Sequence, residues 1–197
     1  MVLCFVKEDE IFDFISDIQQ LKKVKRYGSY DKAFMDSVAE HSYAALVLGL
    51  RLTEEYKLDL NFEKVVKLFL FHDLGELGLA FDFDAYAVSK NEKLKDEKSE
   101  YEQATVAKFA NKHNAHDIGK IVQDYKERTS PEARFAYAVD KLENTVHILN
   151  TKGVKLQKRE HCIAYCEKAA AVFPELWPFA EMLKKKLNIR FDNEEKC

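Results

Sequence analysis

The stretch Val65-Val66-Lys67-Leu68-Phe69-Leu70-Phe71-His72-Asp73-Leu74-Gly75-Glu76 decides how this sequence is interpreted. Asn61 precedes it and is a residue type that caps helix N-termini. The run is almost continuously apolar, which predicts a buried helix interrupted at Gly75, because glycine favours a helix end. His72 and Asp73 are therefore polar groups at the end of a buried helix, where an unpaired charge is unfavourable unless a metal ion or an ion-pair partner compensates it.

The rest of the chain also has the spacing of helices. Ser37 and Glu40 form a capping-box pattern, and Ser130-Pro131 is a cap followed by proline at the first helical position. Apolar residues that recur every three or four positions predict helices at 8–26, 37–56, 61–72, 92–112, 117–127, 131–149, 156–172 and 174–187, with a loop at 81–91 and no strand. Only 6 Gly and 3 Pro are present, too few for many tight turns, so the predicted class is all-α.

Length and composition restrict the classes of function. A chain of 197 residues that is 47% hydrophobic predicts one domain over residues 1–197, with a motif-bearing core at about 10–150 and C-terminal helices at 155–187 packed on it. The net charge of −3 argues against a nucleic-acid or membrane partner. Residues 1–9 lack a secretory signal and no apolar run approaches about 18 residues, so we expect a cytoplasmic protein with reduced cysteines.

Three more polar residues extend the pattern around His72-Asp73. His41 lies one turn inside its predicted helix, Asp140 lies beside the apolar stripe of another, and Glu76 follows Asp73 by three residues. If the helix continued to Glu76, the two carboxylates would share one face. A mixed nitrogen and oxygen set suits one divalent ion of Co, Mn, Fe, Ni or Zn and fits Mg less well. Such an ion can keep open positions for a water and a substrate oxygen, as a hydrolase requires.

A second His-Asp pair, His116-Asp117, follows His113 by three residues and could imitate a metal site. It lies at a polar junction between two predicted helices, so helix capping or a solvated surface is the better interpretation. A metal-free ion-pair network remains the alternative for the first set of residues.

The order His41, His72-Asp73, Asp140 resembles the pattern of the HD-domain metal-dependent phosphohydrolases. The sequence is most similar to the HD-domain 5′-deoxynucleotidases and the related HD domain-containing protein 2 group. The resemblance spans about residues 10–150 and rests on four stretches, at 21–26, 36–42, 71–76 and 130–142. It implies a compact all-helical fold and removal of the 5′-phosphate from deoxyribonucleoside monophosphates.

The resemblance also implies roles for individual residues. His41, His72, Asp73 and Asp140 would hold the metal ion, and Glu76 would be the acid/base residue. Arg26 would bind the phosphate, since a guanidinium group suits phosphate geometry. The remaining substrate-contacting residues implied are Tyr27 against the sugar, with Tyr30 as its alternative, and Asp82, with Asp84 as its alternative.

Other functions stay open at this level. The chain could be an HD-type phosphohydrolase or phosphodiesterase that acts on another nucleotide, or a helical module that binds metal or nucleotide without catalysis. The expected partner is a small nucleotide substrate, and the family suggests a homodimer.

Overall fold

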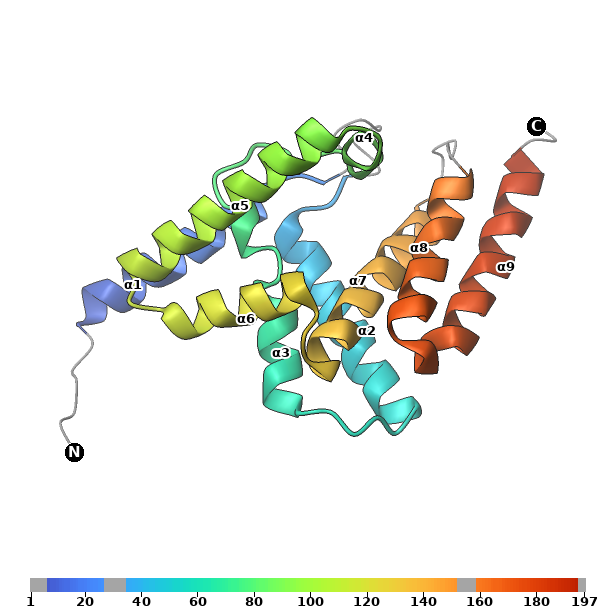
Figure 1. The fold of residues 1–197 in the computed structure, drawn as a ribbon, viewed down its shortest axis with the longest axis horizontal. Helices are drawn as coiled ribbons and strands as arrows, with labels where there is room; N and C mark the ends of the chain where they lie inside the picture. The colour runs from blue at the N-terminus through green and yellow to red at the C-terminus, as the bar shows by residue number, and fades with distance from the viewer. Residues whose placement is uncertain (1–6, 27–34, 152–158, 195–197) are drawn as a thin grey trace.

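The computed structural model describes residues 7–26, 35–151 and 159–194, and within these ranges the chain is helical with no strand beyond isolated bridges. The expected all-α class is therefore confirmed. The elements, labelled in Figure 1, are α1 (Glu8–Ile18), the 3-10 turn η1 (Gln19–Lys22), α2 (Val38–Glu55), α3 (Phe62–Phe71), the 3-10 turn η3 (Leu74–Glu76), α4 (Ala85–Lys90), α5 (Glu92–Lys112), α6 (His116–Glu127), α7 (Pro131–Asn150), α8 (Arg159–Val172), the 3-10 turn η4 (Pro174–Leu176) and α9 (Trp177–Glu194).

Local capping chemistry sets three of the helix starts. The Ser37 hydroxyl accepts a hydrogen bond from the Glu40 amide, and the Glu40 carboxylate accepts one from the Ser37 amide, so the predicted capping box is present. The Asn61 side chain caps α3, and the Ser130 side chain caps α7 with Pro131 in its first turn. These predictions are confirmed. Each cap stabilises its helix because it satisfies a backbone amide that has no partner inside that helix.

Helix α7 is the centre of the molecule. It packs against α2, α3 and α6 and also against α8 and α9, which lie side by side at one end of the ribbon (Figure 1). The Phe135 ring of α7 lies 6.2 Å from Phe69 of α3 and 5.3 Å from Phe173, measured between ring centroids. A polar side chain that α7 directs toward α2 and α3 is therefore surrounded by the core.

The N-terminal part of the chain differs from the prediction. The helix expected at 8–26 is shorter in the structure: α1 ends at Ile18, and the 3-10 turn η1 follows it to Lys22. Lys25 then forms isolated bridges with Ser37 and Phe81, and its amide donates to the Ala80 carbonyl at 3.1 Å. These backbone bonds to distant segments hold the chain extended at Lys25, which helical periodicity cannot anticipate.

Two further boundaries differ. The predicted loop at 81–91 contains α4, which begins where the Asp84 carboxylate accepts a hydrogen bond from the Ala87 amide at 2.8 Å. The helix predicted at 174–187 begins as η4 and runs on as α9 to Glu194, with Phe191 buried one turn beyond the expected end. Residues 152–158, where the preceding helix was expected to begin, lie outside the described residues. Within the described ranges, no helix has both the length and the hydropathy to cross a bilayer.

Candidate metal centre

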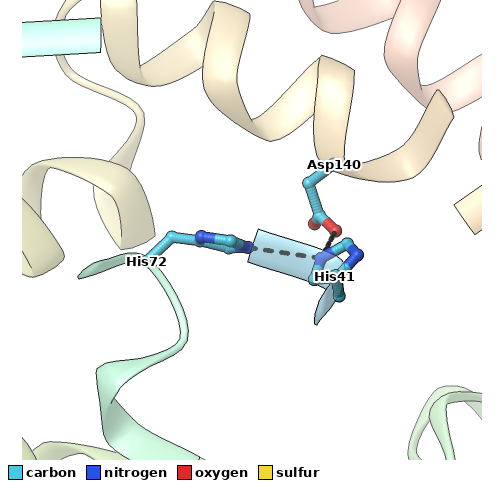
Figure 2. Close-up of side chains that lie close together, drawn as sticks. All are labelled: His41, His72 and Asp140. Carbon is cyan, nitrogen blue, oxygen red and sulfur yellow. Dashed lines mark hydrogen bonds and ion pairs between the residues drawn. The ribbon is translucent and has the colours of Figure 1, made fainter. Parts of the chain in front are cut away.

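Three helices bring two imidazoles and one carboxylate to a single point. His41 lies in the first turn of α2, His72 follows the last residue of α3, and Asp140 lies in the middle of α7. One ligand atom from each of the three lies within 4.8 Å of the others, and all three residues are buried. Figure 2 shows His72 and Asp140 reaching the His41 ring from separate elements. We call these three side chains the imidazole cluster.

The hydrogen bonds of the two histidines leave one lone pair free on each ring. His41 Nδ1 lies 2.5 Å from Glu143 Oε2, and His72 Nδ1 lies 3.0 Å from the Phe69 carbonyl oxygen. Both partners are acceptors, so Nδ1 carries the proton on each ring and Nε2 is the atom available to a metal. The two Nε2 atoms lie 3.4 Å apart. Two nitrogen lone pairs at this distance repel unless a cation, either a proton or a metal ion, lies beside them.

The two oxygens of Asp140 have different partners. Oδ2 accepts hydrogen bonds from the Tyr125 hydroxyl and from Lys141 Nζ, each at 2.7 Å. Oδ1 lies 3.1 Å from His41 Nε2 and accepts a bond from the Asn144 side chain at 3.0 Å. Burial opposes ionisation of Asp140, but Lys141 and His41 hold the pKa of its carboxyl well below the usual range. A charged carboxylate therefore presents one oxygen to the imidazoles.

In the metal-free protein, His41 itself supplies the positive charge. Burial and the Arg26 charge lower the pKa of His41, but its hydrogen bonds to Asp140 and Glu143 outweigh them and raise the pKa to about 9. A proton on Nε2 then occupies the region between the rings and Asp140. The donor set of two imidazole nitrogens and a carboxylate oxygen fits a divalent transition ion, which would replace this proton.

Asp73 lies at the edge of the imidazole cluster. Its Oδ2 atom is 3.2 Å from His72 Nε2 and 3.8 Å from His41 Nε2. Its side chain is 21% exposed, in contrast to the buried Asp140. Burial opposes ionisation, but the neighbouring imidazoles of His72 and His41 hold the pKa of Asp73 below its usual range. Asp73 can thus contribute a fourth oxygen on the open side of the cluster.

A second set of charged side chains surrounds Lys98, which lines the same pocket as His72 and Asp140. Lys98 Nζ of α5 lies 3.4 Å from Glu76 Oε1, 2.8 Å from Asp82 Oδ1 and 3.2 Å from Glu102 Oε1. We call these four side chains the lysine cluster. Burial raises the pKa of Glu76 well above its usual value, and the charges of Asp73 and Asp82 raise it further while Lys98 opposes them. The carboxyl of Glu76 therefore keeps its proton to a higher pH than an ordinary glutamate does.

The helix that carries His72 does not continue to Glu76, so the condition for Asp73 and Glu76 to share one helical face is not met. Helix α3 ends at Phe71, and Glu76 belongs to the 3-10 turn η3. Glu76 nevertheless lines the pocket together with Asp73, because η3 packs against α5.

The structure places the predicted substrate residues differently from one another. Arg26 lines the pocket but is buried, and its guanidinium donates to Asp36 Oδ2 at 3.2 Å and to the Asn144 side chain. Asp82 also lines the pocket, whereas Asp84 caps α4. Tyr27 and its alternative Tyr30 lie outside the described residues.

Several residues around the site were missed at the sequence level. Glu143 and Asn144 lie three and four positions after Asp140 on α7, so helical spacing alone would have placed them on the same face. Tyr125 and Lys98 carried no comparable signal, because Asp140, the partner of Tyr125, and Glu76 and Asp82, two partners of Lys98, lie on other elements.

His72 and Asp140 of the imidazole cluster and all four side chains of the lysine cluster line one pocket of about 680 Å³, whereas His41 does not line it. It extends from His72, Asp73 and Asp140 to the facing surfaces of α5 and α6. A volume of this order accommodates a small organic ligand.

Comparisons with known proteins agree with this geometry. A family model described as HD domain matches residues 18–177. The chain is 29% identical over 137 residues to 5′-deoxynucleotidase HDDC2 of Danio rerio, covering 68% of this chain and 66% of that protein. It is also 29% identical over 161 residues to 5′-deoxynucleotidase HDDC2 of Xenopus laevis, covering 79% of this chain and 75% of that protein. The matched region therefore spans about two thirds to three quarters of these relatives.

Solved structures share the fold at lower identity. A protein described as a predicted metal-dependent phosphohydrolase from Magnetospirillum magnetotacticum MS-1 superposes with a TM-score of 0.72 at 22% identity, covering 92% of this chain and 93% of that one. An HD-domain phosphohydrolase from Listeria innocua gives 0.58 at 17% identity, covering 91% and 86%. At these identities the likeness concerns the fold alone.

Proposed function

Since this chain belongs to the HD-domain family, we propose that it is a phosphohydrolase that uses one divalent metal ion. The observation that carries the proposal is the pair of imidazole Nε2 atoms 3.4 Å apart, with Asp140 Oδ1 3.1 Å from one of them. A buried arrangement of this kind needs a cation, and its ligand types suit a transition metal. The ion would be Co, Mn, Fe, Ni or Zn, with Mg fitting less well.

The proposal gives each polar residue a distinct role. His41, His72 and Asp140 would hold the ion, with Asp73 as the fourth ligand on the open side. When bound, such an ion makes a water more acidic and neutralises phosphoryl charge. Glu76 would move a proton, because burial and the charges of Asp73 and Asp82 raise the pKa of its carboxyl on the pocket wall.

We further propose that the substrates are deoxyribonucleoside 5′-monophosphates. Support comes from the names of the relatives, which are 5′-deoxynucleotidases, and from a pocket of about 680 Å³ that contains both polar and apolar side chains. Arg26 and Asp82, both on the pocket wall, would contact the substrate. Tyr27 remains the residue expected to separate deoxyribose from ribose.

Phosphate release tests the proposal directly. The protein is incubated with each deoxyribonucleoside and ribonucleoside 5′-monophosphate in the presence of Co, Mn, Zn or Mg, and inorganic phosphate is measured. We expect release with at least one transition metal and faster release from the deoxy forms. Equal rates for the two sugars would contradict the substrate assignment. No release from any nucleotide would favour a binding module without catalysis.

The variant Glu76→Gln separates catalysis from metal binding. We expect kcat to fall by about 10²-fold to 10⁴-fold, the usual contribution of a general acid or base. Bound metal, measured by atomic absorption, should not change, because Glu76 is outside the imidazole cluster. Glu175→Gln, which removes an exposed carboxylate, is the matched control. Full activity in Glu76→Gln would reject the acid/base role.

A further inference from the structure

Lys98 is held against Glu76 by unusually close packing of α5 on η3. A Cβ atom added to Gly75 would lie 2.8 Å from Glu102 Cβ and 3.1 Å from Glu102 Cα. The absence of a side chain at Gly75 therefore lets the α5 backbone approach η3. Lys98 lies one helical turn before Glu102, so the same approach brings its ammonium to Glu76, the residue that follows Gly75.

The contacts of Lys98 differ from those of a surface lysine. Its side chain is 24% exposed, and three carboxylates lie within 3.4 Å of Nζ. The ammonium also lies 5.5 Å from the centroid of the Phe83 ring. By contrast, Lys95 on the same helix is 62% exposed and pairs with the exposed Glu92. Exposed pairs of that kind contribute little, whereas buried ones strongly constrain their partners.

The lysine cluster places three carboxyl groups around one ammonium. Glu76, Asp82 and Glu102 are three carboxyl groups, and Lys98 is the only cation that contacts all of them among the described residues. Glu76 uses Oε1 for Lys98, and its buried Oε2 atom makes no hydrogen bond in the described part of the chain. Removing the ammonium would leave the carboxyl groups to repel one another and to repel any anion entering the pocket.

We propose that Lys98 is a positioning residue that holds Glu76 and Asp82 on the pocket wall and supplies the positive charge that lets a phosphate group approach them. The proposal rests on the proposed phosphohydrolase function, which uses Glu76 and Asp82. Lys98 fixes Oε1 of Glu76, and the buried Oε2 makes no competing hydrogen bond within the described part of the chain. The imidazole cluster with its metal ion and the ammonium of Lys98 thus provide two centres of positive charge in one pocket.

The test compares Lys98→Met with Lys95→Met in the metal-loaded protein. Each variant removes one ammonium from α5 while keeping a long side chain. We expect Lys98→Met to weaken the binding of inorganic phosphate, measured by calorimetry, and to lower kcat/KM by about tenfold to a hundredfold. Lys95→Met should match the unaltered protein in both measurements. Lys98→Arg, which keeps the charge, should recover most of the phosphate affinity.

These measurements distinguish failure of the role assigned to Lys98 from failure of the proposed phosphohydrolase function. A folded Lys98→Met that binds phosphate and turns over substrate like Lys95→Met overturns the proposal, as does a Lys98→Arg variant no better than Lys98→Met. If Lys98→Met is unfolded by circular dichroism, Lys98→Gln takes its place, and failure of both to fold assigns Lys98 a structural role and rejects the proposal. If the unaltered protein releases no phosphate from any nucleotide, the proposed function fails, and the phosphate-binding comparison still decides the role of Lys98.

Discussion

The imidazole cluster and the lysine cluster both contribute side chains to the wall of one pocket, yet they obtain their positive charge in different ways. In the imidazole cluster, two Nε2 atoms and a carboxylate oxygen converge, and the metal-free protein can place only a proton among them. In the lysine cluster, Lys98 supplies a permanent ammonium to three carboxyl groups. Under the proposed function, a metal ion would complete the first cluster, whereas the second has its cation within the chain.

Their settings explain the difference. The imidazole cluster is built from α2, α7 and the end of α3, the helices that form the core, and its ligand atoms are held by the buried partners Glu143 and Asn144. The lysine cluster lies where α5 packs on η3, and its side chains are partly exposed except for Glu76. A buried, rigid framework suits a metal ion with strict geometry, whereas a lysine side chain tolerates a looser arrangement.

The largest expected effect comes from removing one imidazole. In His72→Ala the cluster loses one of its three converging atoms, so we expect bound transition metal to be lost and phosphate release to fall below detection. Atomic absorption on the purified protein and the phosphate assay measure the two effects. His116→Ala, which removes an exposed histidine that also lines the pocket, is the control for metal content. Metal retained at full stoichiometry in His72→Ala would show that the imidazole cluster is not the metal site.

A smaller effect is expected from the partner behind His41. The Glu143 carboxylate accepts a hydrogen bond from Nδ1 of His41 and so orients Nε2 of that ring. Glu143→Gln weakens this bond, and we expect metal affinity to fall by about tenfold to a hundredfold, the usual effect of a residue that supports a ligand. Calorimetric titration with Mn²⁺ measures it, and Glu175→Gln is the control at an exposed site. Unchanged affinity would show that α2 alone orients the ring.

The metal affinity of the imidazole cluster should also depend on pH. Because the pKa of His41 in the metal-free protein is raised to about 9, a metal ion must displace a proton at neutral pH. Metal affinity should therefore rise by up to about tenfold per pH unit and become constant near the raised pKa.

The stability of the metal-free protein should change with pH in the direction opposite to its metal affinity. A raised pKa in the folded state stabilises the metal-free protein fully below the ordinary pKa of about 6.5, and this stabilisation is lost as the pH rises through about 9. Calorimetry in steps of pH measures the affinity, and urea unfolding of the metal-free protein measures the stability. A metal affinity independent of pH between about 7 and 9 would contradict a protonated His41.

The smallest expected effect concerns the packing beneath the lysine cluster. A methyl group at Gly75 would contact the Glu102 side chain and backbone too closely, so Gly75→Ala should lower the free energy of unfolding by about 1–3 kcal/mol. At Gly119 an added Cβ would lie 3.7 Å from Ala110 Cβ, an ordinary contact, so Gly119→Ala should be neutral or stabilising by up to about 1 kcal/mol. Urea unfolding measures both. Equal stability of the two variants would show that α5 can move away from η3.

Much of the helical framework was predictable because it depends on local interactions. The capping box of Ser37 and Glu40, the Asn61 cap and the Ser130-Pro131 start each involve residues within one helical turn. The end of α1 was not predictable, because Lys25 is held extended by Ala80 and Asp82, more than fifty residues away in the sequence. The placement of Glu76 in a 3-10 turn likewise depends on packing against α5.

The candidate site divides in the same way. The sequence by itself determined which side chains can bind a metal ion, because His72 ends an apolar helix, and His41 and Asp140 belong to amphipathic ones. Only the tertiary structure decided that His41, His72 and Asp140 meet, that Glu143 orients one imidazole, and that Lys98 pairs with Glu76. Residue type and helical spacing are local properties of the chain, whereas the distance between two charges depends on how separate helices pack.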